Sequence, residues 1–233
     1  MRIAVIPARG GSKRIPRKNV REFCGKPMIA WSIEAALKSE CFEQVIVSTD
    51  DEEIASISRN YGADIPFVRP ISIADNHTGI HQVIAHAVDW FQNQGITPDY
   101  FCCIYATAPF IQAKDIQSGL KLISEKHCDY VFSVTSFAFP IQRALKFEAD
   151  GKVGMFYPKS YNTRSQDLEE AYHDAGQFIW ASPKVWKQCR PVFTSNSYPV
   201  ILPRFRVQDI DTQEDWERAE LMFNSLKLSD QNQ

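Results

Sequence analysis

The sequence predicts an α/β fold in which a doubly wound, mostly parallel sheet is covered by helices on both faces. Strand and helix patterns alternate through the first half of the chain, and the strands are nearly continuous apolar runs. Such runs are typical of strands buried on both faces, and this alternation is typical of parallel sheets. From about residue 136 to 182 the pattern changes to short extended pieces rich in aromatic residues. This change predicts a protruding arm, inserted into a single domain that spans residues 1–233.

The expected strands are short runs rich in β-branched and aromatic residues. They lie at residues 2–6, 44–48, 65–68, 100–104 and 130–134, and a last strand ends at Val207. The expected helices carry apolar residues at helical spacing. They lie at residues 28–38, 52–61, 78–94 and 113–125, with a last helix from 212 to about 226. The run Thr49-Asp50-Asp51 is expected to cap the helix that begins at about residue 52, and Thr212 to Asp215 resembles a capping box.

The composition limits the possible functions. A chain of 233 residues that is 44% hydrophobic can bury a full core. After the arm, residues 183–188 are expected to belong to the main domain again. The net charge of −2 argues against a nucleic-acid surface. No apolar run approaches the ~20 residues of a membrane span, and no signal peptide is evident. The six cysteines lack C-x-x-C spacing, which favours free thiols in a cytoplasmic protein, with Cys102 and Cys103 on opposite sheet faces.

The most informative motif is the loop ARGGSKRIPRKN at residues 8–19, which follows the first strand directly. Between Arg9 and Lys26 the chain carries seven Lys or Arg residues and one acid, Glu22. Glycines at the end of a strand let backbone N–H groups approach an anion, and cations neutralise it. The loop therefore predicts a polyphosphate site. The alternative is an ordinary turn with a solvated basic face, and the loop matches neither a P-loop nor G-x-G-x-x-G.

A second motif is the Asp209-Ile210-Asp211 segment near the end of the chain. In an extended segment, residues two apart project to the same side, so the two carboxylates would form a pair while Ile210 points into the core. Ligands of open α/β sheets bind beyond the strand ends, and paired carboxylates suit Mg²⁺ there. The alternative is a helix N-cap preceded by a surface aspartate.

Together these motifs resemble the CMP-sialic acid synthetase family, cytidylyltransferases that activate nine-carbon acidic sugars. The resemblance rests on the loop from Pro7 to Asn19 and on Asp209 and Asp211, and its parts follow in order along nearly the whole chain. It implies that the anomeric hydroxyl of the sugar attacks the α-phosphorus of CTP and that pyrophosphate leaves. Positioning and charge neutralisation carry such chemistry. It also implies a homodimer in which the arm closes over the neighbour's site.

The resemblance assigns roles to individual residues. Lys18 would face the charge that develops on the α-phosphate, and Asp209 and Asp211 would hold Mg²⁺. The expected catalytic residues are Lys18, Arg9 and Asp211. The expected nucleotide-binding residues are Ala8, Arg9, Gly10, Gly11, Ser12, Lys13, Lys18, Asn19, His77 and Thr78. For His77 and Thr78 a helix N-cap is the alternative, and the His77–His81 spacing lacks a third zinc ligand.

The expected sugar site combines two parts of the chain. The segment after the strand 100–104 keeps the family's threonine and proline but has Tyr105 for its glutamine and lacks its arginine, which argues against an N-acetylneuraminic acid pocket. Residues 137–143 and 162–178 look like the branch that activates pseudaminic acid, with a solvated loop as the alternative, and Arg164 can clamp a carboxylate. The expected sugar-binding residues are Tyr105, Thr107, Arg143, Arg164, Gln166, His173 and Gln177.

The expected function is therefore Mg²⁺-dependent transfer of CMP from CTP to a nine-carbon acidic sugar, pseudaminic acid by this resemblance. N-acetylneuraminic, legionaminic and Kdo sugars remain alternatives, as does a non-catalytic nucleotide-binding module. An RNA-binding protein is disfavoured by the acidic total and by the absence of clustered aromatic residues. CTP and the sugar are the expected partners, with neither nucleic acid nor membrane.

Overall fold

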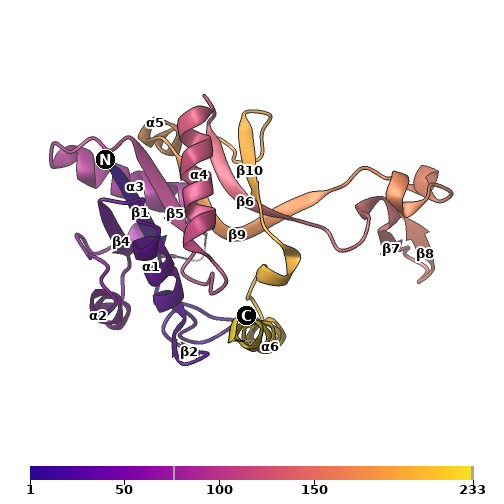
Figure 1. Ribbon diagram of the computed structural model, residues 1–233, viewed down its shortest axis with the longest axis horizontal. Coiled ribbons are helices and arrows are strands. Elements are labelled where there is room, and N and C mark those ends of the chain that lie inside the picture. Colours follow the sequence, from indigo (N-terminus) through magenta and orange to yellow (C-terminus); the bar gives the residue numbers. More distant parts are fainter. Residues whose placement is uncertain (76, 232–233) are drawn as a thin grey trace.

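The computed structural model describes residues 1–75 and 77–231 and is built on a six-stranded sheet with the order β10-β6-β9-β5-β1-β4 (Figure 1). The strands are β1 (Arg2–Pro7), β4 (Gln44–Ser48), β5 (Tyr100–Ile104), β6 (Tyr130–Ser136), β9 (Tyr172–Ala181) and β10 (Ser197–Ile201). β1 is parallel to both β4 and β5, and β10 is parallel to β6. Only β9 is antiparallel to its two neighbours in this sheet. The mainly parallel α/β fold is thus confirmed.

Helices cover both faces of the sheet. α1 (Met28–Lys38) and α4 (Ala113–Glu125) pack on one face, with α2 (Glu52–Asn60) beside them. α3 (Ile80–Asn93) and α5 (Pro183–Lys187) pack on the other face. Successive side chains of each strand alternate between these two cores, as strand geometry requires. Cys102 and Cys103 divide between them, as expected.

A third, smaller core forms beneath α6 (Gln213–Gln231) and a short hairpin of β2 (Glu22–Phe23) and β3 (Lys26–Pro27). Its buried members include Ile15 from the loop after β1, Phe110 from the segment after β5 and Ile210 from the segment before α6. Trp216 of α6 packs against them in the same core. The third core therefore fastens three functional segments to one another.

The arm reaches away from the sheet as residues 137–171 (Figure 1). It carries a small hairpin of β7 (Leu145–Phe147) and β8 (Val153–Met155) and short 3₁₀ turns. The expected arm boundary near residue 182 was wrong, because β9 lies inside the central sheet. The run from Phe178 to Ala181 is buried between β5 and β6.

Two expected strands differ from the structure. Residues 65–68 form no strand, and only Asp64 makes an isolated bridge, to Ile46. Pro66 lacks the N–H that a ladder needs, which explains this difference. The last strand, β10, ends at Ile201 rather than Val207, shortly before Pro203.

The predicted starts of the helices agree more closely with the structure. The N–H of Ile54 donates to Oδ1 of Asp51 (3.0 Å), which confirms this N-cap of α2. Thr212 and Asp215 bond reciprocally, which confirms the capping box. α3 begins at Ile80 after the N-cap Gly79, slightly later than expected. Among the residues described, no helix is both long and apolar enough to cross a membrane.

Candidate active site

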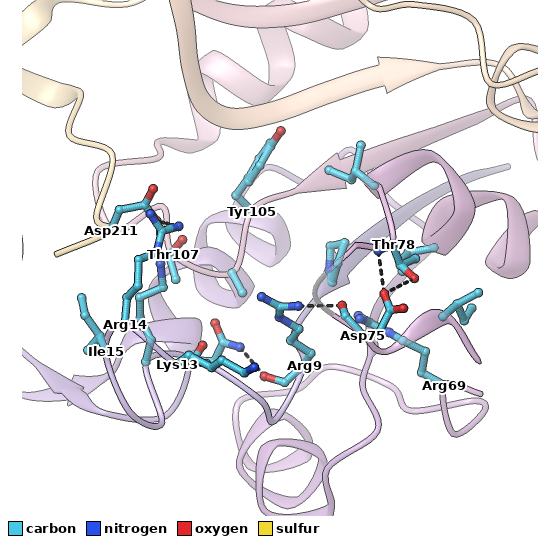
Figure 2. A pocket seen from close by; sticks show the side chains of 18 of the residues that line it. Arg9, Lys13, Arg14, Ile15, Arg69, Asp75, Thr78, Tyr105, Thr107 and Asp211 are labelled. Atoms are coloured by element: carbon cyan, nitrogen blue, oxygen red, sulfur yellow. Dashed lines mark hydrogen bonds and ion pairs between the residues drawn. The ribbon is translucent and has the colours of Figure 1, made fainter. Parts of the chain in front are cut away.

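A cavity of about 380 Å³ opens beyond the carboxyl ends of β1 and β5 (Figure 2). From β1 the chain passes first to β4 on one side and later to β5 on the other, so the strand order reverses here. Ligands of open α/β sheets bind at such switch points, because the loops on either side diverge and leave a crevice. The loop after β1 and the residues Tyr105 and Thr107 after β5 line this cavity.

The loop after β1 is held from below by the segment that follows β4. The N–H of Gly10 donates to Oδ1 of Asp50 (3.1 Å). A Cβ added at Gly10 would lie 2.6 Å from Oδ2 of Asp51, so only glycine fits this close approach. The side-chain amide of buried Asn19 donates to the carbonyl of Arg9 (3.0 Å) and ties the two ends of the loop together.

Arg17 fastens the loop rather than lining the cavity. Its Nη1 and Nη2 donate to the two carboxylate oxygens of Asp51, at 2.6 and 3.0 Å, and it also contacts Glu53. The hydrogen-bonded carboxylate raises the pKa of Arg17, and the guanidinium lowers the pKa of Asp51. Arg17 adopts a positive φ of 55°, which the paired side chain helps to maintain.

The cavity is lined by positive charge. The cationic side chains among its lining residues are Arg9, Lys13, Arg14, Lys18 and Arg69. Arg9 reaches across the cavity, where its Nη1 donates to the carbonyl of Asp75 (2.6 Å, Figure 2). Arg69 is 5% exposed and donates to the side chain and carbonyl of Ser48, and burial lowers its pKa to about 10. Arg69 therefore stays cationic at neutral pH, and the site suits a polyphosphate.

The two aspartates lie at the same cavity although they are not in a strand. Residues 207–211 are irregular, and Ile210 is fully buried in the third core. With Ile210 anchored there, Asp209 and Asp211 both line the cavity. The expected pair is thus present, but a buried isoleucine in a loop positions it instead of a strand end.

The two carboxylates differ in their partners. Oδ1 of Asp211 lies 2.8 Å from Nη2 of Arg14 and 3.4 Å from Nζ of Lys18. Asp209 makes no ion pair within the described ranges, and burial together with Asp211 raises its pKa. A divalent cation would relieve this uncompensated charge, and oxygen donors suit Mg²⁺. Among the side chains that the structure describes, in residues 1–75 and 77–228, no group of three or more His, Cys, Asp or Glu is arranged to hold a metal ion.

The expected nucleotide-binding residues divide into two groups. Those that line the cavity are Arg9, Ser12, Lys13, Lys18, Asn19 and Thr78. Ala8, Gly10, Gly11 and His77 are not among the lining residues; the side chain of Ala8 is buried in the core, and its N–H donates to Ser48 O (2.9 Å). The N–H groups of Ala8, Gly10 and Ser12 bond within the protein, so the positive charge at the cavity comes from the cationic side chains that line it.

The segment before α3 forms a turn of its own. Oδ1 of Asp75 accepts from the N–H groups of His77 (2.9 Å) and Thr78 (2.7 Å). His77 is exposed, whereas Thr78 faces the cavity. Asn76, which the sequence placed in this segment, lies outside the described residues. Neither His77 nor Thr78 is the N-cap of α3, because Gly79 takes that position.

The expected sugar-binding residues are not brought together within one chain. Tyr105 and Thr107 line the cavity. Gln177 is buried instead, and its Nε2 donates to the carbonyl of Arg206 (2.7 Å). His173 lines a separate, largely apolar hollow on the sheet and packs against Phe137.

The remaining three lie on the arm, away from the cavity. Nη2 of Arg143 donates to the carbonyl of Thr163 (2.7 Å). Nε of Arg164 donates to Oδ2 of Asp167 (2.8 Å), and Gln166 lines a small hollow within the arm. Within a single chain, Arg143 and Arg164 bond to other residues of the arm, and none of the three side chains lines the cavity.

Three residues at the site were not singled out from the sequence. Arg14 was counted only among the loop cations, yet it pairs with Asp211. Arg69 reaches the cavity through its bonds to the end of β4, which no local pattern reveals. Asp174 lines a neighbouring cavity of about 220 Å³, and its only local signal was a place inside the polar run 162–178.

A mainly parallel sheet with a cation-lined cavity and a carboxylate pair at its switch point defines a nucleotide-binding protein of the nucleotidyltransferase class. The comparison with known families is more specific. The chain belongs to the cytidylyltransferase family, whose sequence model matches residues 3–218. The family expected from the motifs is confirmed.

Individual proteins of known activity are also similar to this chain. The chain is 42% identical over 221 residues to the pseudaminic acid cytidylyltransferase of Campylobacter jejuni subsp. jejuni (strain 81-176), covering 95% of each chain. It is 31% identical over 228 residues to the CMP-N,N'-diacetyllegionaminic acid synthase of Legionella pneumophila, again covering 95% of each. A solved CMP:2-keto-3-deoxy-manno-octonic acid synthetase, complexed with CTP, has a TM-score of 0.69 at 15% identity and covers 96% of this chain and 98% of that one. That structure supports the fold.

Proposed function

We propose that this chain transfers CMP from CTP to the anomeric hydroxyl of pseudaminic acid and releases pyrophosphate. The observation that carries the proposal is the meeting of Lys18, from the cationic loop, with Asp211 at one cavity. The 42% identical relative supports pseudaminic acid as the sugar. The legionaminic acid relative, at 31%, supports the main alternative.

The geometry supports a division of labour along the triphosphate. Arg9 and Lys13 would neutralise the β- and γ-phosphates, which leave as pyrophosphate. Lys18 lies next to the carboxylates and would neutralise the charge that grows on the α-phosphate. The anomeric oxygen forms a bond to the α-phosphorus, while the bond from that phosphorus to the bridging oxygen of pyrophosphate breaks. Preorganised cations of this kind act without reorganising during the reaction.

Asp209 and Asp211 would hold the magnesium ion. When bound there, Mg²⁺ supplies positive charge that favours the ionised form of the attacking hydroxyl. The test is a Mg²⁺ titration of turnover in the wild type and in Asp211→Asn, with the exposed Asp64→Asn as a matched control. Turnover of Asp211→Asn that equals the wild type at every Mg²⁺ concentration would show that this pair does not bind the ion.

The position and the surface of the arm support the proposal that the enzyme is a homodimer. Arg143, Arg164 and Gln166 lie beyond reach of their own cavity, so they could serve a sugar only in a neighbouring chain. The arm also exposes large apolar side chains, with Phe139 at 82% and Phe147 at 84% exposure. Such exposed residues are typical of surfaces that a partner covers. A second copy of this chain, related by twofold symmetry, is the proposed partner.

The proposed location is the cytoplasm. All six cysteines are free thiols, among them the buried neighbours Cys102 and Cys103. Free thiols are usual where the environment is reducing, and disulfides are common where it is oxidising. Fractionation of cells that make the protein would test the location directly, with turnover expected in the cytoplasmic fraction.

The deciding experiment measures pyrophosphate release from CTP and Mg²⁺ with one sugar at a time. The panel consists of pseudaminic, N-acetylneuraminic, legionaminic and Kdo sugars. Turnover with pseudaminic acid alone is the expected result. Turnover with another sugar would retain the cytidylyltransferase reaction but overturn the assignment of the sugar. Absence of turnover with all four, in protein that still binds CTP, would favour a non-catalytic nucleotide-binding module.

A further inference from the structure

The smaller cavity of about 220 Å³ adjoins the nucleotide cavity at the switch point. Tyr105, Thr107 and Asp209 line both cavities, so the two meet at these side chains. Since the loop cations mark the larger cavity for the triphosphate, the smaller one lies on the side where the acceptor sugar would bind. Its other lining residues are Asp174, Gly176 and Gln208.

The charge of the smaller cavity is opposite to that of the larger one. Its lining residues include two carboxylates, Asp174 and Asp209, and neither lysine nor arginine. A sugar carboxylate would be repelled here, whereas hydroxyl and amide N–H groups would find acceptors. The smaller cavity is therefore suited to the donor-bearing part of an acidic sugar.

A bulge in β9 places Asp174 at this cavity and at the edge of the neighbouring apolar hollow. Phe132 of β6 pairs with Ile179, but Val134 pairs with Asp174, so a step of two positions along β6 matches a step of five positions along β9. Gly176 lies within the bulge at a φ of 61°, a conformation that favours glycine. Bulges of this kind redirect side chains, and they are frequent beside active sites.

The carboxylate of Asp174 has few partners inside the protein. Its Oδ1 accepts from the N–H of Gly176 (2.8 Å), and it forms no ion pair within the described part of the chain. Burial raises the pKa of Asp174, and the nearby Asp209 adds to this rise. A half-buried carboxylate with free lone pairs is costly unless a ligand supplies donors.

We propose that Asp174 is a specificity-determining contact for the acceptor sugar, accepting hydrogen bonds from a hydroxyl or acetamido N–H group of that sugar. This inference rests on the proposed function, because it assumes that the acceptor is an acidic sugar rich in such donors. It assigns the carboxylate of the sugar to a different place, away from Asp174 and Asp209. The phenol of Tyr105, whose pKa is raised by burial, provides a hydrogen-bond donor in the same cavity.

The test compares Asp174→Asn with the wild type in steady-state kinetics against pseudaminic acid and CTP. Asparagine can still accept from the N–H of Gly176, so the bulge is retained, and the thermal midpoint checks this. We expect kcat/KM for the sugar to fall about 10- to 100-fold, as for loss of a hydrogen bond to a charged group. KM for CTP and the thermal midpoint should stay at their wild-type values. Asp64→Asn, on an exposed aspartate, is the matched control.

A second measurement is made on the sugar and does not depend on folding. Wild-type enzyme is assayed with sugar analogues in which each hydroxyl or amide N–H donor is replaced singly. One replacement should lower kcat/KM in the wild type by the same factor as Asp174→Asn, and the two losses should not add in the variant. Two results would overturn the assignment of Asp174 while the wild type is active. One is that the losses add for every analogue, and the other is that Asp174→Asn has the same kinetics for the sugar as the wild type. A wild type that converts no acidic sugar would overturn the proposed function together with this inference.

Discussion

Nζ of Lys18 lies 3.4 Å from Oδ1 of Asp211, although 193 positions separate the two residues in the chain. The same ammonium group donates to the carbonyl of Ile210 at 2.5 Å. Lys18 thus joins the cationic loop to the segment that carries Asp209 and Asp211, the carboxylate segment. The contact lies on the side of the cavity where the α-phosphate is proposed to bind. This contact is the basis of the first prediction.

Replacing Lys18 with methionine should lower kcat by about 10²- to 10³-fold, the loss typical of removing one donor that stabilises developing charge. CTP affinity should change less, because Arg9 and Lys13 remain. Pyrophosphate release and CTP binding measure the two effects separately. Lys121→Met, on the exposed face of α4, is the control. Wild-type turnover in Lys18→Met would reduce Lys18 to a structural partner of Asp211.

The Arg17–Asp51 pair should stabilise the protein in a pH-dependent way. The pKa of Asp51 is lowered in the folded state, so its contribution is present above the unfolded value of about 3.9 and disappears as the pH falls through the lower folded value. Arg17→Met should cost about 1 kcal/mol at pH 7, since the pair is partly exposed. Urea unfolding at pH 7 and below pH 4 measures the difference, which should shrink in acid. Arg59→Met, which breaks an exposed pair with Glu52, should change stability less; a loss independent of pH would contradict the linkage.

Adjacent glycines provide a matched pair of variants. Gly10→Ala would place its Cβ 2.6 Å from Oδ2 of Asp51, whereas a Cβ at Gly11 meets no atom within 4 Å. Gly10→Ala should therefore lower the free energy of unfolding by about 1–3 kcal/mol, because Asp51 must move away from Arg17. Gly11→Ala should leave it nearly unchanged. Equal stabilities of the two variants in chemical denaturation would show that the loop can move away from α2.

A buried ion pair supports the carboxylate segment from behind. Nη1 of Arg206 lies 2.6 Å from Oδ2 of Asp115, at the start of α4, and their side chains are 7% and 11% exposed. Arg206→Met should cost about 3–5 kcal/mol, because it leaves a buried charge without a partner. The double variant Arg206→Met with Asp115→Leu should recover much of that loss, as measured by denaturant unfolding. Failure of the double variant to exceed the single one in stability would mean that packing, and not charge, decides this site.

Mixing two inactive variants tests the arm. If the arm of one subunit serves the other's site, Lys18→Met and Arg164→Met each inactivate a different part of that shared site. Hybrid dimers would then contain one site with an intact loop and an intact arm, so unfolding and refolding the mixture should restore measurable turnover. The control is each variant refolded alone. Mixtures that stay as inactive as the separate variants would contradict an arm that works between subunits.

Much of the fold follows from local patterns. The bounds expected for α1, β4, β5 and α4 agree with the structure, since continuous apolar strands and amphipathic helices are strong signals. The two wrong predictions, a strand at residues 65–68 and the end of the arm, have local causes that the pattern of apolar residues does not reveal. Pro66 prevented a strand at 65–68, and the first half of β9 is too polar and aromatic to be distinguished from the arm before it.

The site was foreseeable in its chemistry but not in all its geometry. The loop cations and the two aspartates belong to short motifs, so their types and spacing predicted the nucleotide substrate, and the metal stays a prediction. Arg69 and Asp174 belong to no such motif. Arg69 reaches the cavity through Ser48, and Asp174 through a register shift between β6 and β9.

The residue order alone therefore specified a mainly parallel α/β fold, a polyphosphate loop and a carboxylate pair, because each depends on neighbours within a few residues. Packing of distant segments decided which groups share a cavity. The third core, by burying Ile15, Phe110 and Ile210 together, sets the loop, the segment after β5 and the two carboxylates side by side. Likewise, only the tertiary structure separates the arm from its own cavity, since the chain leaves the sheet after β6 and returns to it as β9 (Figure 1).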